Sequence, residues 1–429
     1  MKTIENPIRS SWAELCKRPA LDSEKLDAVV LEILNQVKLN GDRALHAYAK
    51  KFDNLELPNL KVSDAEFAAA EQAVSSELKA AIEVAKGNIE RFHSSQKEIV
   101  NPIETTPGVV CWRESKAIEK VGLYIPGGSA PLFSTVLMLG IPAKLAACPE
   151  ISLCTPPAKN GSIHPAILYT AKLLGIQNVY KVGGAQAIAA MAFGTESIPA
   201  VYKIFGPGNQ FVTKAKERVQ QMGIAIDMPA GPSEVLVIAD ETCDPAFVAA
   251  DLLSQAEHGA DSQVLLLSPS AEVLNQVNLE LEKQLQALPR KELAAQALAS
   301  SRAILLSTMD QCFELSNLYA PEHLIIASAQ AEVYLHLVQN AGSVFVGNYS
   351  CESAGDYASG TNHTLPTNGF ARSYSGVSLD SFVRKITFQK LSPEGLKRIG
   401  PAIEIMADAE ELVAHKNAVS LRLKRLADV

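Results

Sequence analysis

Apolar residues in the first part of the chain recur at the three- and four-residue spacing of amphipathic helices. One such run covers residues 21–52 and is interrupted at Gly41. A second opens with Ser63 and Glu66, the Ser-x-x-Glu pattern of a capping box, and its Ala-rich continuation predicts one long helix to about Gln96. Helices of this kind usually cover a hydrophobic core; a partner-binding surface is the alternative.

The middle of the chain changes to short apolar runs that are separated by glycine turns and helix-compatible segments. Three times a predicted strand is followed by a glycine turn and a helix-like segment, which is the rhythm of a parallel sheet with helices on its faces. After Phe382 the chain is predicted to be polar and helical. The predicted strands are residues 121–125, 151–155, 179–182, 202–205, 234–239, 264–267, 303–306, 324–327 and 342–346.

Composition narrows the class of protein. With 429 residues, 47% of them apolar and 20% charged, the chain fits a globular protein of two or more domains. The net charge of −8 argues against a nucleic-acid partner, because phosphate binding favours a basic face. No apolar run approaches the roughly 20 residues that span a bilayer, and the N-terminus lacks the apolar core of a signal peptide. The seven scattered cysteines indicate reduced thiols and a cytoplasmic protein.

The three glycine turns could hold a nucleotide or another ligand at the strand ends. None has the G-x-G-x-x-G pattern with an acidic residue about 20 positions later, so the standard dinucleotide fingerprint is excluded. Each glycine is also explained by a tight turn alone. Gln186 and Asn209 are the polar side chains at two of these turns, and Tyr124 ends the first strand, where its ring could pack on a ligand.

Two clusters combine imidazole with polar or acidic side chains. If residues 252–261 are helical, Gln255 and His258 share a face and could begin a metal site, although a His and a Gly at a helix end also form an ordinary cap. Glu322 and His323 stand before a predicted strand, where a Glu–His pair could share proton transfers. Neighbouring strand residues point to opposite faces, so the pair works together only if the backbone bends; a surface turn is the alternative.

Acidic and imidazole side chains also occur in two segments nearer the C-terminus. Residues 351–364 are rich in Gly and Ser, show no helical or strand period, and contain Asp356, which could be an oxygen ligand or a turn residue. Glu410 and His415 lie five positions apart in the last predicted helix and therefore share no face. A solvated helix would explain both of these residues.

These motifs, in their order along the chain, resemble the histidinol dehydrogenases, a family of zinc- and NAD-dependent enzymes that complete histidine biosynthesis. The likeness runs from residue 121 to the tail, and the N-terminal helices look similar as well. The matching motifs are VGLYIPGGSAPLFSTVLML, VGGAQAIAA, IFGPGNQFVTKAK, DMPAGPSEVLVIAD, DLLSQAEHG, PEHLI, SAGDYASGTNH and AEELVAHKNAV.

The resemblance implies an α/β fold of two Rossmann-like domains, doubly wound but incomplete, with parallel sheets, a helical N-terminal arm and a helical C-terminal tail. The limits expected on this basis are 1–22 for the arm, 23–120 with 235–375 for the larger domain, 121–234 for an inserted domain with NAD contacts, and 376–429 for the tail. The family enzyme is a homodimer in which the tail contributes to the partner's active site.

The resemblance also implies the reaction and the roles of single residues. L-histidinol would be oxidised through L-histidinaldehyde to L-histidine, with two NAD⁺ as acceptors. The zinc ligands would be Gln255, His258, Asp356 and His415. The catalytic pair would be Glu322 and His323, and the NAD contacts Tyr124, Gln186 and Asn209. The substrate would contact Ser233, Glu410, His323 and the four zinc ligands. For His363 the resemblance implies no direct role, only that it could support the residues of the site.

Other functions are compatible with the residues alone. An aldehyde dehydrogenase would need a reactive cysteine; Cys111 and Cys154 lie in strand-like runs typical of buried packing residues, whereas Cys351 is close in sequence to Asp356. A non-catalytic module that binds a metal or a nucleotide is a second alternative. The metal could be manganese or cobalt, since a His, Asp and Gln set does not select zinc, and the substrate could be a related amino alcohol.

Overall fold

The computed structural model describes residues 1–18, 23–127 and 131–428, which form two compact units. The first comprises Met1–Ser95 and Ile118–Phe382, and the second Gln96–Ala117 and Val383–Val429. The start of the first predicted helix, at residues 21 and 22, and part of the first glycine turn, at residues 128 and 129, lie outside the described residues.

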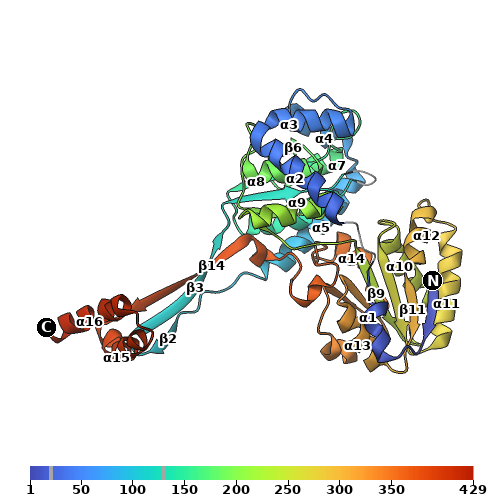
Figure 1. Cartoon of the computed structure of the whole chain (residues 1–429). Coiled ribbons are helices and arrows are strands. Elements are labelled where there is room, and N and C mark those ends of the chain that lie inside the picture. The colour runs from blue at the N-terminus through green and yellow to red at the C-terminus, as the bar shows by residue number, and fades with distance from the viewer. Residues whose placement is uncertain (19–22, 128–130, 429) are drawn as a thin grey trace. The chain divides into compact units, whose positions relative to one another are not determined.

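The larger sheet of the first unit has six parallel strands in the order β1-β11-β10-β9-β12-β13 (Figure 1). Every residue of β9 and β10 is buried, because helices cover both faces of a parallel sheet. This is why their sequences are continuous apolar runs instead of alternating ones. The strands are β1 (Lys2–Glu5), β9 (Glu234–Ala239), β10 (Gln263–Ser268), β11 (Arg302–Leu305), β12 (His323–Ala327) and β13 (Ser343–Val346).

Alternate residues of β9 pack on the two opposite helical layers, as the two-residue period of a strand requires. Val235 and Val237 join a core that contains residues of α10 (Pro245–Ala256), α11 (Ala271–Leu285) and α12 (Lys291–Ala299). Leu236 and Ile238 join the other core. That core contains residues of α1 (Trp12–Leu15), α13 (Met309–Tyr319) and the 3₁₀ helix η3 (Ala331–Leu337).

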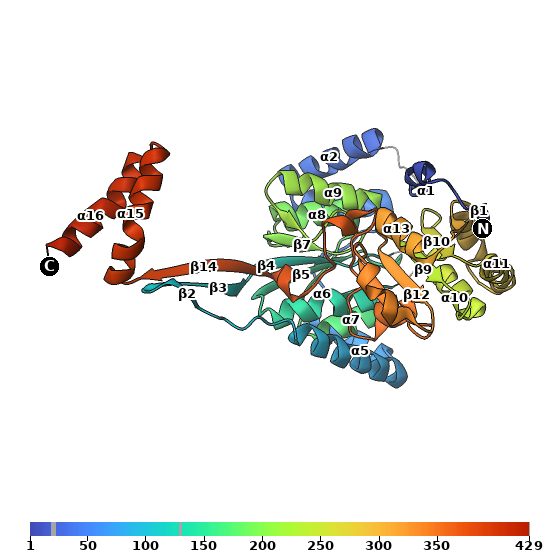
Figure 2. The same ribbon diagram turned by 90° about the horizontal axis from the view of Figure 1, so that it is seen from below.

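The smaller sheet of the first unit also has parallel strands, in the order β6-β5-β4-β7-β8. Figure 2 shows α2, α8 and α9 on one side of it and α6, α7 and α5 on the other. Its strands are β4 (Lys120–Tyr124), β5 (Glu150–Thr155), β6 (Asn178–Lys181), β7 (Lys203–Phe205) and β8 (Ala225–Ile226). The helices around it are α2 (Ser23–Asn40), α3 (Asp42–Tyr48), α4 (Asp64–Ala73), α5 (Ser76–Ser94), α6 (Phe133–Leu145), α7 (Pro165–Leu173), α8 (Gly184–Phe193) and α9 (Gln210–Gln221).

The second unit is an antiparallel three-stranded ribbon followed by two helices. β3 (Val109–Ala117) pairs along its full length with β14 (Val383–Leu391), and β2 (Ile103–Thr106) pairs with β3. The helices are α15 (Pro393–Ala409) and α16 (Val413–Ala427). The ribbon was not predicted, and the expectation of helix directly after Phe382 is wrong. Most ribbon residues are only half-buried or exposed, so they lack the apolar run that marks a buried strand.

The parallel α/β class is confirmed, and all nine predicted strands are present within a residue or two. The long helix predicted to Gln96 is instead two helices, because Ser75 accepts a hydrogen bond from the Leu78 N–H and starts a new one. The capping box of Ser63 and Glu66 is confirmed. The segment predicted to be irregular contains a short helix, α14 (Glu352–Tyr357), and the N-terminal arm contains a strand as well as helical turns. No described helix is long and apolar enough to cross a membrane.

Candidate active site

The predicted catalytic pair lies where β12 begins, at the amino-terminal edge of the larger sheet. α13 ends at Tyr319, the next residue, Ala320, has a left-handed φ of 55°, and Pro321 follows. Glu322 precedes the first residue of the strand, so strand alternation does not separate it from His323. Both side chains are buried, and the Glu322 Oε2 atom lies 3.7 Å from His323 Nδ1. The bend that the pair requires is therefore present.

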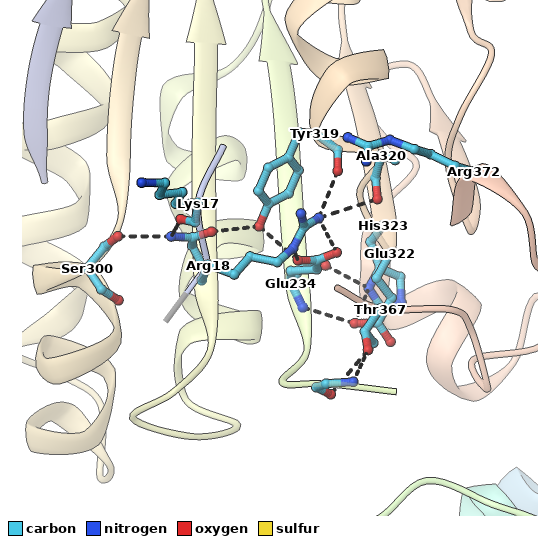
Figure 3. A network of polar contacts seen from close by, with 12 residues as sticks. Lys17, Arg18, Glu234, Ser300, Tyr319, Ala320, Glu322, His323, Thr367 and Arg372 are labelled. Atoms are coloured by element: carbon cyan, nitrogen blue, oxygen red, sulfur yellow. Dashed lines mark hydrogen bonds and ion pairs between the residues drawn. The ribbon is translucent and has the colours of Figure 1, made fainter. Parts of the chain in front are cut away.

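The first residue of β9, Glu234, joins the two members of this pair (Figure 3). Its backbone N–H donates to Glu322 Oε2 over 2.9 Å, and its carbonyl oxygen lies 3.3 Å from His323 Nδ1. β9 and β12 are parallel neighbours in which His323 stands opposite Val235. The sheet register thus places the backbone of one residue of β9, Glu234, in contact with both the carboxylate and the imidazole.

Two carboxylates of α14 complete the surroundings of the imidazole. Glu352 Oε1 lies 3.7 Å from His323 Nδ1, and Asp356 Oδ1 lies 3.6 Å from His323 Nε2. Residues four apart share a helix face, so one turn of helix presents both acids. Glu352 is fully buried and was missed in the sequence. The signal that could have found it is the spacing of two acids in the stretch ESAGD.

Burial and the mutual charges of this cluster shift its proton equilibria. Burial raises the pKa of Glu322 to about 7 and that of Glu352 to about 8, although the positive charge of His323 opposes both shifts. Burial lowers the pKa of His323, but the surrounding carboxylates, first of all Glu352, raise it by more. Burial raises the pKa of Asp356, and its contact with His323 lowers it by more. Carboxyl groups that titrate near neutrality beside an imidazole can accept and donate protons during a reaction.

The expected metal ligands of the first unit lie around the end of α10. The helix stops at Ala256 and His258 follows it in a turn, so the prediction that Gln255 and His258 share one helix face is wrong. Gln255 is fully buried, and neither its Oε1 nor its Nε2 has a hydrogen-bond partner among the described residues. Desolvation lowers the pKa of His258 by more than the charge of Asp356 raises it, so the pKa lies below its ordinary value. A metal requires the neutral imidazole, and the Gln255 amide oxygen is not engaged in a hydrogen bond with any described residue.

These residues fit part of a metal site. Among the described residues, no three His, Cys, Asp or Glu side chains form a metal-binding group. Glu410 and His415, expected to contact substrate and metal, are exposed residues of the second unit. Their grouping with Gln255, His258 and Asp356 stays a prediction.

Two further predicted residues adjoin the cluster. Ser233 is half-buried and directly precedes β9. His363 Nδ1 lies 2.9 Å from the Asp356 carbonyl oxygen, and its Nε2 lies 3.1 Å from Thr135 Oγ1. His363 therefore supports the backbone of the segment that carries Asp356.

The three residues expected to contact NAD line one cavity of about 580 Å³ at the carboxyl ends of β4 and β6 and the start of α9. Tyr124 is buried, and its hydroxyl accepts a hydrogen bond from the Gly184 N–H at the start of α8. Asn209 caps α9 by accepting from two backbone N–H groups. The cavity thus opens beside two helix N-termini, which favour anionic groups such as phosphates. The predicted residues that line it are Tyr124, Gln186 and Asn209.

A buried ion pair that was not foreseen holds one of the glycine turns. Gly206 has a φ of 130°, and a Cβ there would lie 2.1 Å from the Tyr124 carbonyl oxygen, so only glycine fits. Its N–H donates to Asp227 over 2.8 Å, and its carbonyl accepts from Lys216 Nζ over 2.9 Å. Lys216 and Asp227 are themselves an ion pair, which fixes the turn that leads to Asn209.

The seven cysteines are all free. Cys154 is buried as predicted, whereas Cys111 is only half-buried. Burial raises the pKa of Cys148 to about 11 and that of Cys312 to about 12, and it also raises the pKa of Cys154. Thiols with raised pKa values are poor nucleophiles near neutral pH, which weakens the alternative of a cysteine-dependent aldehyde dehydrogenase for these three.

Comparison with known proteins gives one consistent result. A family profile described as histidinol dehydrogenase matches residues 16–423. A histidinol dehydrogenase of Bacteroides fragilis is 59% identical over 99% of this chain and 100% of its own length, and one of Yersinia pestis is 54% identical over 96% and 93%. The crystal structure of histidinol dehydrogenase from Elizabethkingia anophelis superposes with a TM-score of 0.98, at 62% identity, over 100% of this chain and 99% of the other. The chain therefore belongs to the histidinol dehydrogenase family and is an oxidoreductase.

Proposed function

We propose that this chain is a zinc- and NAD-dependent histidinol dehydrogenase, which oxidises L-histidinol through L-histidinaldehyde to L-histidine with two NAD⁺ in the last step of histidine biosynthesis. It would act in the cytoplasm as a homodimer. The observation that carries the proposal is the buried Glu322–His323 pair, together with the end of α10, where the buried Gln255 amide has no hydrogen-bond partner among the described residues and His258 interacts electrostatically with Asp356 and His323. Metal-assisted oxidation of an alcohol needs a group that accepts a proton and side chains that bind the metal, and these residues would supply both.

Gln255, His258 and Asp356 would hold the zinc ion, with His415 as the fourth ligand. Burying an amide without a hydrogen bond costs about 1–3 kcal/mol, and coordination of Gln255 Oε1 would offset that cost. The neutral amide would leave the ion more electrophilic than a second carboxylate would. When bound, zinc would act mainly as a template that orients the alcohol, and NAD⁺ would supply the acceptor of the hydride.

His323 would act as the base in both oxidations. In the first, its neutral imidazole takes the hydroxyl proton of the alcohol while the hydride leaves the same carbon, which yields the aldehyde. Because the surrounding carboxylates raise the pKa of His323 to about 10, this neutral form becomes the main one only at alkaline pH. Glu352 and Asp356 lie 3.7 Å and 3.6 Å from the two ring nitrogens, and their charges would stabilise the imidazolium that forms. In the second oxidation, His323 takes a proton from the hydrated aldehyde as the second hydride leaves, and the acid is the product.

Glu322 would activate the water that adds to the aldehyde between the two oxidations. Its raised pKa, about 7, suits a group that exchanges a proton near neutral pH. The Glu234 N–H holds one of its oxygens, which leaves the other for the water. Ser233 and Glu410 would complete the contacts with the substrate.

NAD would occupy the cavity of Tyr124, Gln186 and Asn209 in the proposed inserted domain, residues 121–234. The paired helix N-termini would receive its phosphates. The turn held by Lys216 and Asp227 keeps that end of the cavity in shape before the cofactor arrives.

The direct test is the formation of NADH from L-histidinol and NAD⁺, measured by absorbance. We expect two NADH per histidinol, no reaction with L-alaninol, which lacks the imidazole, and a loss of activity with a chelator that added zinc reverses. Absence of NADH formation from histidinol would contradict the proposed reaction. Full activity in protein shown to contain no metal would contradict the zinc site.

The C-terminal tail would supply Glu410 and His415 to the partner's active site. None of the described residues of α16 is buried, and large apolar residues of the second unit are exposed, among them Ile405 and Val413. Exposed apolar residues in such numbers are typical of an interface.

Mixing two inactive variants tests this arrangement. His415→Ala and His323→Asn chains, unfolded and refolded together, should recover about one quarter of wild-type activity, because half of the dimers are mixed and each has one intact site. Refolding either variant alone is the control and should give none. If the mixture also stays inactive while mixed dimers are present, each site is built from a single chain.

A further inference from the structure

Arg18 and Glu234 form a buried ion pair next to the catalytic pair (Figure 3). The exposed fraction of the side chain is 13% for Arg18 and 2% for Glu234. The guanidinium binds both carboxylate oxygens, with Nε donating to Oε2 and Nη2 donating to Oε1 over 2.8 Å. The Tyr319 hydroxyl lies 2.9 Å from the same carboxylate. Two-point contacts of this kind fix orientation as well as distance.

The same guanidinium also binds the end of α13. Its Nη2 donates to the Tyr319 carbonyl over 2.8 Å and lies 3.5 Å from the Ala320 carbonyl, and its carbon lies 3.9 Å from the centre of the Tyr319 ring. Ala320 has the left-handed conformation that few residues other than glycine adopt. A backbone held in this region needs support from its surroundings, and Arg18 supplies it.

Both segments that Arg18 joins lead directly into the catalytic pair. Glu234 contacts Glu322 through its N–H and His323 through its carbonyl oxygen. On the other side, Ala320 is two residues before Glu322 in the chain. The guanidinium therefore connects the start of β9 with the turn that enters β12, and both of these segments set the position of the pair.

We propose that Arg18 is a positioning residue, which sets the orientation of Glu322 and His323 by tying the start of β9 to the turn before β12. The inference rests on the proposed function of that pair. A gain in folding stability does not by itself explain this ion pair, because the free energy that burying two charges costs is about as large as the free energy that their attraction returns. A fixed geometry is what the two-sided contact provides.

The test compares variants of Arg18 with a matched control in the same segment. Arg18→Met removes every guanidinium contact, and Arg18→Lys keeps the charge but loses the two-point contact. Arg9→Met is the control, since Arg9 forms an exposed ion pair with Glu314. For Arg18→Met we expect kcat for histidinol to fall by about 10- to 100-fold, the size of effect that a small misplacement of reacting groups produces. KM for NAD⁺ and zinc content should not change.

Arg18→Lys should recover part of kcat, and Arg9→Met should equal the wild type. Full kcat in Arg18→Met would overturn the proposal. So would a loss that is accompanied by an equal loss of bound zinc or of folded protein in both Arg18 variants, because Arg18 would then act only in folding. If Arg18→Met alone fails to fold, the double variant Arg18→Met with Glu234→Gln removes both charges, and it should fold yet keep the low kcat. A folded double variant with full kcat would overturn the proposal.

Amide hydrogen exchange separates this inference from the proposed function. In Arg18→Met, residues 319–323 should exchange faster than in the wild type, while the strand β10 should not. This measurement requires no substrate. If the wild type is inactive on histidinol but Arg18→Met shows this local change, the proposed function is refuted and the structural contact stands. Unchanged exchange at residues 319–323 in Arg18→Met would refute the positioning role.

Discussion

His323→Asn is expected to lower kcat for histidinol oxidation by about 10²- to 10⁴-fold, the usual contribution of a positioned base. His323 is the only residue that meets Glu322, Glu352 and Asp356 together among the described ion pairs. Asparagine keeps a polar group at Nδ1 for the Glu234 carbonyl but cannot take a proton. Steady-state NADH formation gives kcat, and metal analysis should show unchanged zinc.

Glu322→Gln is the comparison variant. It should slow the conversion of histidinaldehyde to histidine more than the first oxidation, because only the second half of the reaction requires activated water. Equal losses at both steps would remove the case for a dedicated water activator. Wild-type turnover in His323→Asn would remove His323 from its role as the base.

Gln255→Met is expected to lower zinc affinity by at least about 10- to 100-fold, which is the effect of losing even an outer partner of a metal ligand. Yet the metal-free protein should be as stable as the wild type or more stable, by up to about 1–3 kcal/mol, because methionine removes a buried amide that has no hydrogen-bond partner. Competition with a zinc indicator measures the affinity, and thermal unfolding in chelator measures the stability.

Gln263→Met is the matched control. Gln263 is an equally buried glutamine, but its amide is satisfied, since Nε2 lies 3.3 Å from the carbonyls of Lys17 and Ser300 and Oε1 lies 2.9 Å from the Tyr319 hydroxyl. Its loss should destabilise the metal-free protein by about 1–3 kcal/mol and leave zinc affinity unchanged. If both glutamine variants lose stability alike, the amide of Gln255 has a structural partner and is no free ligand.

The position of the site departs from the usual arrangement of parallel sheets. Ligands commonly bind where the carboxyl ends of the strands meet, and the cavity of Tyr124 and Gln186 follows that rule in the smaller sheet. The proposed catalytic pair lies instead at the amino-terminal edge of the larger sheet, where β9 and β12 begin. At this edge, the residues around the proposed catalytic pair come from the ends of α10 and α13 and from the short helix α14.

Much of the fold could be predicted because the relevant forces are local. Parallel strands buried on both faces must be apolar throughout, so β9 and β10 were recognisable from their residues alone. The capping box at Ser63 is a contact between residues three apart and was equally readable. The ribbon of β3 and β14 could not be predicted in this way. Its stability comes from pairing between segments far apart in the chain, and its half-exposed residues have no apolar period.

For the site, the sequence by itself determined which residue types were available and, through the resemblance to a family, which of them to group. Only the tertiary structure decided that Glu322 and His323 share one space, because this depends on the left-handed turn at Ala320 and on the register between β12 and β9. The spacing of two acids in the stretch ESAGD marks Glu352 as a candidate, but its contact with His323, like the contact of Arg18 with Glu234, was beyond the sequence. Each meets its partner across a long stretch of chain, and no local spacing encodes a contact that packing alone creates.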